Sequence, residues 1–155
     1  MTIFRAPEAR DAAALVGMAD ALCLHQGDPT GNFTIEKALR DVIAPDAPLS
    51  CLVAEKAGAL EGFVFWHFAY ETCYAARGGH VTDLYVSENQ RGSGIAEGLL
   101  RAAARSVKAA GGEYLWLTNH KTNTRARAFY AKHMEATDHV IVQFAAWERF
   151  AALAR

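Results

Sequence analysis

Apolar residues recur every three or four positions in several segments of the chain, which is the spacing of an amphipathic helix. The clearest segment runs from Ile95 to Ala110, with apolar residues on one face and charged residues on the other. Glu97 precedes Arg101 by four residues there, which is the favourable order for an ion pair on a helix. The same spacing predicts further helices, over residues 7–26, 34–43, 124–134 and 146–155.

Other segments are short, rich in Val, Phe and Trp, and bounded by turn residues, which is typical of β-strands. Residues 49–55 and 60–70 are separated by a short turn containing Gly58, so these two strands are expected to form an antiparallel hairpin. Residues 71–79 are expected to form a loop. Further strands are predicted over residues 2–5, 81–86, 113–118 and 139–144.

These elements follow one another in the order β-α-α-β-β-β-α-β-α-β. Such an order predicts an α/β (α+β) fold, in which a mixed sheet carries helices on both faces. The segment from Val81 to Thr118 contains a strand, a helix and a second strand, and we expect it to be a right-handed crossover. Because no linker or repeat divides the chain, a single domain over residues 1–155 is expected.

Composition and charge exclude several classes of function. The formal net charge is −1 and the pI about 6.6, whereas a nucleic-acid-binding domain usually has a basic face and a high pI. The 3 cysteines and 6 histidines lack the spacing of a disulfide framework or a metal site. No apolar stretch approaches the ~20 residues of a membrane helix. We therefore expect a cytoplasmic protein that binds no metal, nucleic acid or membrane.

The stretch VTDLYVSENQRGSGIAEGLL, residues 81–100, predicts a binding site. A strand leads through Arg91-Gly92-Ser93-Gly94 directly into a helix. Glycines let backbone N–H groups approach a ligand, and the N-terminus of a helix attracts negative charge. Phosphate or pyrophosphate is the natural ligand of such a loop, and a tight turn without a ligand is the alternative. A P-loop is excluded because no Lys-Ser or Lys-Thr follows, and Glu97 replaces the third glycine of a dinucleotide motif.

Two motifs resemble those of one known family. The run Arg91-Gly92-Ser93-Gly94-Ile95-Ala96 resembles the R/Q-x-x-G-x-G/A signature of the GNAT N-acetyltransferase superfamily. A second run, Asn123-x-x-Ala126-x-x-Phe129-Tyr130, looks like the N-x-x-A-x-x-F-Y helix of that family. The resemblance covers most of the chain. It implies a GNAT-like, mostly antiparallel sheet of six to seven strands, with acetyl-CoA as the co-substrate and an amine as the acceptor.

The resemblance also implies roles for the matching residues. Main-chain groups of a splayed strand would hold the pantetheine arm of coenzyme A, at Leu84, Tyr85 and Val86. The glycine loop would hold the pyrophosphate, through Arg91, Gly92, Ser93, Gly94, Ile95 and Ala96. The second motif would supply further cofactor contacts, through Asn123, Ala126 and Phe129. Tyr130 would protonate the departing thiolate, and the alternative for Tyr130 is a core aromatic beside Phe129.

The acceptor amine needs a group that takes its proton, because an amine with a pKa of about 10.4 is mostly protonated at neutral pH. Asp83 is the first candidate by its position on the central strand, and Glu71 and His80 are alternatives. Nearby aromatic residues could line an acceptor pocket, although aromatic residues in a strand more often belong to the core: Trp66, His67, Tyr70 and Tyr74.

Within the superfamily, the chain looks most similar to the spermidine/spermine and diamine N-acetyltransferases. Thr82-Asp83 stands where those enzymes have a Glu-Asp pair, which departs from the polyamine pattern. The resemblance implies a small-molecule acceptor, of the polyamine, diamine or amino-acid-like class, and a homodimer. The alternatives are a non-catalytic acyl-CoA-binding regulatory module and a protein or peptide N-acetyltransferase.

Overall fold

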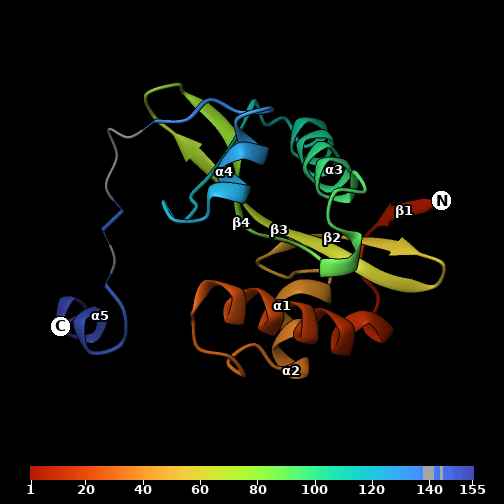
Figure 1. Cartoon of the computed structure of the whole chain (residues 1–155). Helices are drawn as coiled ribbons and strands as arrows, with labels where there is room; N and C mark the ends of the chain where they lie inside the picture. Colours follow the sequence, from red (N-terminus) through yellow and green to blue (C-terminus); the bar gives the residue numbers. More distant parts are fainter. Residues whose placement is uncertain (138–141, 144) are drawn as a thin grey trace. The chain divides into compact units, whose positions relative to one another are not determined.

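The structure is a computed structural model that describes residues 1–137, 142–143 and 145–155. The chain forms two compact units, Met1–Thr118 and Asn119–Arg155. The first unit contains the sheet and the longer helices (Figure 1). Among the described residues, no helix is long and apolar enough to cross a membrane.

The first unit is built on a five-stranded sheet with the strand order β1-β2-β3-β4-β5. Its strands are β1 (Thr2–Arg5), β2 (Ser50–Lys56), β3 (Ala59–Glu71), β4 (Ala76–Val86) and β5 (Tyr114–Leu117). Neighbouring strands are antiparallel except β4 and β5, which are parallel. The hairpin predicted from residues 49–55 and 60–70 is confirmed as β2 and β3, and the mixed α/β class is confirmed with it.

Helices cover both faces of the sheet, as predicted (Figure 1). Helix α3 (Ile95–Ala109) connects β4 to β5 and covers one face, while α1 (Ala12–Gln26) and α2 (Ile35–Ala38) cover the other. A 3₁₀ turn over Ala9–Asp11 precedes α1, so the α-helix begins later than the predicted Pro7. The second predicted helix starts as expected and continues as a π-helical turn, Leu39–Ile43.

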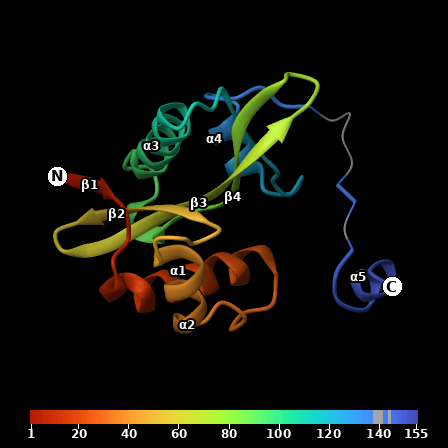
Figure 2. The same ribbon diagram turned by 180° about the vertical axis from the view of Figure 1, so that it is seen from behind.

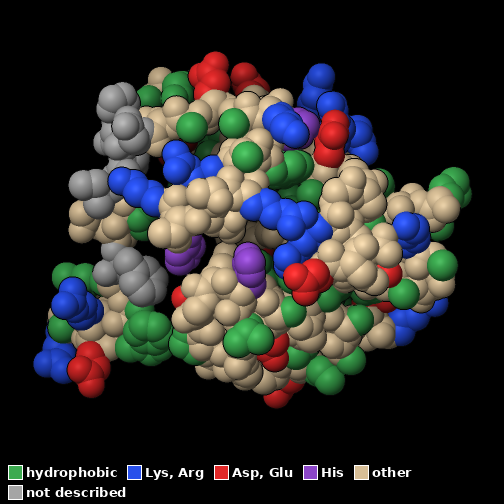
Figure 3. All heavy atoms as spheres, viewed as in Figure 1, with side chains coloured by type: hydrophobic (Ala, Val, Ile, Leu, Met, Phe, Trp, Pro, Cys, Tyr) green, Lys and Arg blue, Asp and Glu red, His purple; other side chains and the backbone are tan. Residues whose placement is uncertain are grey.

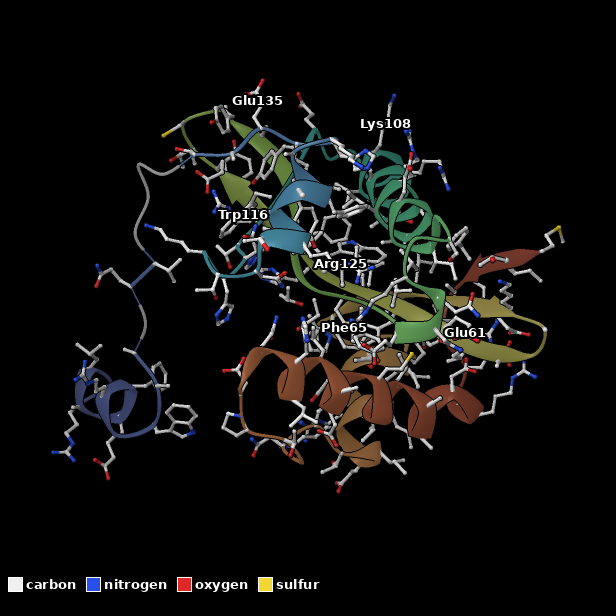
Figure 4. The ribbon with its side chains drawn as sticks, in the orientation of Figure 1. Glu61, Phe65, Lys108, Trp116, Arg125 and Glu135 are labelled. Carbon is white, nitrogen blue, oxygen red and sulfur yellow. The ribbon has the colours of Figure 1, made fainter. Side chains whose placement is uncertain are left out.

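Each face of the sheet has its own apolar core, because side chains along a strand alternate between the two faces. On β3, Val64 and Trp66 belong to the core beneath α3, and Phe63 and Phe65 belong to the core against α1. Figure 4 shows Phe65 between the sheet and α1. The α3 core is completed by residues of that helix, including Leu99 and others: Ile95, Ala103 and Val107.

The prediction of a loop over residues 71–79 is wrong. Strand β3 continues to Glu71 and β4 begins at Ala76, which leaves only residues 72–75 for the turn. The start of β4 was not predicted because it contains Gly78 and Gly79, and glycine is disfavoured in strands. Close packing explains them, because a Cβ atom on Gly78 would overlap the ring of Tyr114. The β3–β4 hairpin is consequently long and projects beyond α1 and α3 (Figure 2).

The number of strands also differs from the expectation of six to seven, since the described residues contain five. The strand predicted over residues 139–144 falls largely on positions outside the described residues. The second unit contains α4 (Thr124–Tyr130) and α5 (Trp147–Leu153). Helix α4 ends at Tyr130 rather than at the predicted Met134, and α5 lies inside the predicted range of 146–155.

Candidate active site

Strand β4 extends beyond its parallel neighbour. The two strands pair from Gly78 and Tyr114 to Val81 and Leu117, and β4 then continues to Val86. On its other side, β4 stays paired with β3 along this length. Residues 82–86 of β4 therefore form an open edge, which has no strand beside it in the described part of the chain.

Main-chain groups of Leu84 and Val86 point toward this open edge. Ser87 donates its N–H to the carbonyl of Glu61 at 2.8 Å, so these two residues form a hydrogen-bonded pair of the β3–β4 ladder. In an antiparallel ladder, such pairs alternate with pairs whose N–H and C=O groups point outward. Counting back along β4, the main chain of Tyr85 faces β3, whereas that of Leu84 and of Val86 faces away from it.

The side chain of Arg91 supports this assignment. Its Nε lies 3.4 Å from the carbonyl oxygen of Val86, which is the direction expected for an outward-facing carbonyl. Its guanidinium also lies 3.6 Å from the carboxylate of Glu88, which is exposed. Arg91 thus folds back against the open edge of β4 and places a positive charge at the end of that edge.

The loop between β4 and α3 depends on two glycines in the left-handed region. Gly92 has a φ of 86° and Gly94 a φ of 87°, which other residues rarely adopt. The hydroxyl of Ser93 donates to the carbonyl of Gln90 at 2.6 Å. Lys56 in turn donates to the side-chain oxygen of Gln90 at 2.9 Å, so that the loop is tied to β2.

The loop leads into the N-terminus of α3, which has no side-chain cap among the described residues. The first N–H groups of a helix have no partner within the helix, and they carry partial positive charge. Helix α3 begins at Ile95, directly after Gly94. A Cβ atom added to Gly92 or Gly94 would meet nothing within 4 Å, so the space around both glycines is open. These residues therefore fit a phosphate or pyrophosphate group, as the sequence predicts.

Asp83 lies on the face of the sheet that α1 covers, since it is paired with Phe65 in the ladder. Its side chain is half-buried. Burial raises the pKa of its carboxyl group above the ordinary value of 3.8, against the opposing effects of a hydrogen bond with Thr82 and of His80. A carboxylate with a raised pKa at the open edge of β4 suits acid–base chemistry.

His80, on the same face, is held by β3 and β5. Its Nδ1 lies 3.0 Å from Nε2 of His67, and Nδ1 of His67 lies 3.1 Å from the carbonyl oxygen of Phe68. The ring of His80 stacks on Trp116 with centroids 3.9 Å apart and an interplanar angle of 7°. Figure 4 labels Trp116, which comes from β5. Burial and His67 lower the pKa of His80 below 6.5, while Asp83 opposes this effect.

The other residues considered from the sequence lie elsewhere. Glu71, an alternative proton acceptor, is exposed at the end of β3. Trp66 is 4% exposed and belongs to the core beneath α3, so the core interpretation is correct for it. Tyr70 and Tyr74 are exposed near the turn of the β3–β4 hairpin. Sequence reasoning named His67 and His80 separately and missed that they form a hydrogen-bonded pair.

In the second unit, the residues of the second motif organise α4. Asn123 caps this helix, since its side-chain oxygen accepts the N–H of Ala126 at 3.0 Å. The rings of Phe129 and Tyr130 contact each other edge to face, with centroids 5.1 Å apart. The capping role explains why the motif begins with Asn and leaves the amide nitrogen of Asn123 available to a ligand.

Charged side chains of both signs are spread over the face shown in Figure 3, in keeping with the net charge of −1. Among the described residues, no group of three or more His, Cys, Asp or Glu side chains is arranged to hold a metal ion.

Comparisons with known proteins identify the family of this sequence. The model of the acetyltransferase (GNAT) family matches residues 18–135, which include both the glycine loop and the second motif. No curated protein sequence matches the chain.

Several solved structures have the same fold. A ribosomal-protein-alanine N-acetyltransferase from Brucella melitensis biovar Abortus is 24% identical, with a TM-score of 0.75 over 94% of this chain and 100% of the other. A predicted acetyltransferase with acetyl-CoA from Clostridium acetobutylicum is 19% identical, with a TM-score of 0.70 over 93% and 96% of the two chains. An aminoglycoside acetyltransferase from an uncultured soil metagenomic sample is 16% identical, with a TM-score of 0.73 over 94% and 95%.

Proposed function

Because the chain belongs to the acetyltransferase (GNAT) family, we propose that it transfers the acetyl group of acetyl-CoA to a primary amine of a small molecule. The acceptor class that we propose is a polyamine, a diamine or an amino-acid-like amine. One observation carries the proposal: the open edge of β4 is followed, after a single 3₁₀ turn over Glu88–Gln90, by the glycine loop at the N-terminus of α3.

The first unit supplies two parts of the coenzyme A site in this proposal. The loop from Arg91 to Ala96 binds the pyrophosphate through backbone N–H groups and the positive end of α3. Leu84 and Val86 hydrogen-bond the pantetheine arm through their main-chain groups, which face outward. Tyr85 contributes its side chain, which stacks on Phe63 with centroids 6.0 Å apart and stiffens this part of β4.

Acetyl-CoA supplies the acetyl group as a thioester. An outward-facing N–H of β4 stabilises the negative charge that develops on the thioester oxygen, which is often the largest single contribution to such a reaction. Asp83 attracts the ammonium form of the acceptor, whose proton must be lost before the amine can attack. Removing that proton at neutral pH costs roughly 4–5 kcal/mol for an amine with a pKa of about 10.4.

The second motif completes the proposal. Asn123 donates its amide nitrogen to the pantetheine arm while its oxygen caps α4, and Ala126 and Phe129 contact the cofactor. Tyr130 gives its proton to the departing thiolate. The thiol has a pKa near that of cysteine, about 8.5, so the thiolate is a fair leaving group and Tyr130 contributes only part of the rate. Dimerisation and a cytoplasmic location stay predictions.

A free-thiol release assay with acetyl-CoA tests the proposal, using polyamines, diamines, amino acids, aminoglycosides and peptides as acceptors. We expect thiol release with a small primary amine, together with an acetylated product detected by mass spectrometry. Release with peptides alone would replace the small-molecule acceptor by a protein. Binding of acetyl-CoA by calorimetry without any release would favour the regulatory module, and no binding would overturn the site itself.

A matched pair of variants makes this assay specific to the loop. Gly94 and Gly111 lie at opposite ends of α3, with φ values of 87° and 83°, and a Cβ atom meets nothing within 4 Å at either position. Gly94→Val and Gly111→Val therefore impose similar strain, about 1–2 kcal/mol. We expect Gly94→Val alone to weaken acetyl-CoA binding, by about tenfold in Kd. Equal Kd values for the two variants would contradict the loop's role.

A further inference from the structure

We propose that His80 takes the proton of the acceptor amine, and that His67 and Trp116 orient its imidazole ring for this step. The inference rests on the proposed acetyl transfer and names the proton acceptor of that reaction. It is argued from three contacts across β3, β4 and β5, all of which lie in the first unit.

The hydrogen bonds define which nitrogen of His80 is available. The carbonyl oxygen of Phe68 can only accept, so the Nδ1 of His67 that lies 3.1 Å away bears the hydrogen. In a neutral His67, Nε2 is then the acceptor, and Nδ1 of His80 donates to it across 3.0 Å. A neutral His80 consequently keeps its lone pair on Nε2. No described residue forms a hydrogen bond with that nitrogen.

This arrangement lets His80 gain a proton without moving. When Nε2 accepts a proton, Nδ1 still donates to His67, so no hydrogen bond has to break. The ring of Trp116 lies parallel to the imidazole at 3.9 Å, and an aromatic face stabilises a cation placed over it. The same stack fixes the plane of the ring and therefore the direction of the Nε2 lone pair.

The place of His80 in the sheet matches the end of the proposed thioester site. His80 is opposite Trp116 in the β4–β5 ladder, and Val81 is the last residue of β4 paired with β5. The open edge of β4 starts at the next residue. His80 is therefore adjacent to the point where the strands part, and Asp83 lies three residues further along the same strand.

The titratable groups around His80 favour a neutral imidazole before the reaction. His67 from β3 and burial lower its pKa, and Asp83 on β4 opposes them. Trp116 from β5 has no charge, and from α1 the thiol of Cys23 is close enough to Asp83 for its pKa to be raised by that carboxylate as well as by burial. A base that is neutral at pH 7 can accept a proton at once.

Imidazole also matches the acceptor amine better than a carboxylate does. The amine has a pKa of about 10.4, and the ordinary values are about 6.5 for His and about 3.9 for Asp. By these ordinary values, proton transfer to an imidazole is less unfavourable than transfer to a carboxylate, and burial narrows this difference by lowering the pKa of His80 and raising that of Asp83. In the step itself an N–H bond of the ammonium group breaks and an Nε2–H bond forms on His80. Water takes the proton from His80 after the acetyl group has been transferred.

The pH dependence of kcat/KM tests this inference, with the best amine from the thiol-release assay as acceptor. For the wild type we expect kcat/KM to fall below the imidazole pKa, because protonated His80 cannot accept a proton. His80→Gln should lower kcat/KM about 10²-fold at pH 7 and abolish this fall. The residual activity of His80→Gln should rise as the pH approaches the pKa of the amine, because there the acceptor loses its proton to water. The affinity for acetyl-CoA should stay unchanged.

Two further variants separate positioning from structure. His67→Gln keeps an oxygen that can accept the N–H of His80, whereas His67→Phe does not. We expect His67→Phe to move the midpoint of the acidic fall and lower kcat/KM, and His67→Gln to restore part of it. His25→Gln is the control, since His25 is exposed on α1 and outside this cluster. A fall that survives in His80→Gln and disappears in Asp83→Asn would assign the proton to Asp83 and overturn the inference.

NMR of the imidazole nitrogens gives an answer that does not depend on the acceptor. We expect neutral His80 with its hydrogen on Nδ1 and neutral His67 with its hydrogen on Nδ1. A hydrogen on Nε2 of neutral His80 would overturn the inference even if acetyl transfer is confirmed. Conversely, an absence of thiol release with the expected tautomers would count against the proposed function and not against the histidine pair.

Discussion

The two faces of the sheet differ in what they contain. The face beneath α3 holds an apolar core, with Val64, Val81 and Leu99 buried in it. The face that α1 covers is equally apolar around Phe63. Beyond Phe65 it carries three titratable side chains, those of Asp83, His80 and His67. The same strand, β4, contributes to both faces.

This difference separates two tasks. The α3 face fixes the helix whose N-terminus is proposed to hold the pyrophosphate, so its packing sets the position of the glycine loop. The face that α1 covers does not position the glycine loop. Its histidines are tolerated because His80 pairs with His67, and His67 pairs with the backbone carbonyl of Phe68. Substitutions on the first face should therefore change stability, and substitutions on the second should change catalysis.

Leu99→Ala should have the largest effect and disrupt the apolar core beneath α3. Leu99 lies on the face of α3 that packs on the sheet and is fully buried, so its truncation leaves a cavity. We expect the free energy of unfolding to fall by about 2.7–5 kcal/mol, measured by denaturant titration. Leu24→Ala is the matched control, because Leu24 is 75% exposed on α1 and should change stability by less than about 0.5 kcal/mol. Similar losses in both variants would contradict the distinction.

Asp83→Asn should show the opposite pattern on the other face. Burial raises the pKa of Asp83, so the folded state binds this proton more tightly than the unfolded state. Stability contributed by Asp83 is therefore lost as pH rises from 3.8 through the folded pKa. We expect Asp83→Asn to be as stable as the wild type or more stable at pH 7, and the difference to vanish in acid.

Asp83→Asn should also lower kcat/KM roughly 30-fold, which corresponds to about 2 kcal/mol of lost transition-state stabilisation. The reason is that the ammonium form of the acceptor loses its charged partner. Glu71→Gln removes an exposed carboxylate from the end of β3 and should change kcat/KM little. If Asp83→Asn lost both stability and activity, Asp83 would have a structural role in the face that α1 covers and not a catalytic one.

Tyr130→Phe should have the smallest effect and sharpen the comparison, because Tyr130 belongs to the second unit and not to the sheet strands that form the two faces. It removes only the proposed donor to the thiolate, so kcat should fall about tenfold with little change in the Kd of acetyl-CoA. Its pH profile should keep the acidic fall assigned to His80. Tyr74→Phe, at an exposed position of the β3–β4 hairpin, is the control. An unchanged kcat would remove Tyr130 from the mechanism.

Local sequence was enough to predict the features that depend on neighbours in the chain. The glycine loop followed by a helix from Ile95, and the hairpin around Gly58, appear where they were expected. The Glu97–Arg101 ion pair is also present, with 2.8 Å between its charged groups. Each of these features is encoded within a few residues, by a left-handed glycine or by helical spacing.

Cross-strand placement was harder to predict. The start of β4 was missed because the strand begins with Gly78 and Gly79, whose absent side chains make room for β5. Without that start, the register of the hairpin was unknown, and the register alone brings His67 opposite His80. If the turn had been predicted at residues 72–75, the histidine pair would have followed. Such a turn places Glu71 opposite Ala76, and counting four residues along each strand from there places His67 opposite His80.

The exposed turn at residues 72–75 affects how well the β3–β4 hairpin tolerates changes in its length. Its backbone is closed by two local hydrogen bonds of 3.2 Å, from the N–H of Tyr74 to the carbonyl of Glu71 and from the N–H of Ala75 to the carbonyl of Thr72. Insertions or deletions at such a tip leave the ladder behind it intact. The hairpin can therefore gain or lose residues at its tip without a change in the register that brings His67 opposite His80.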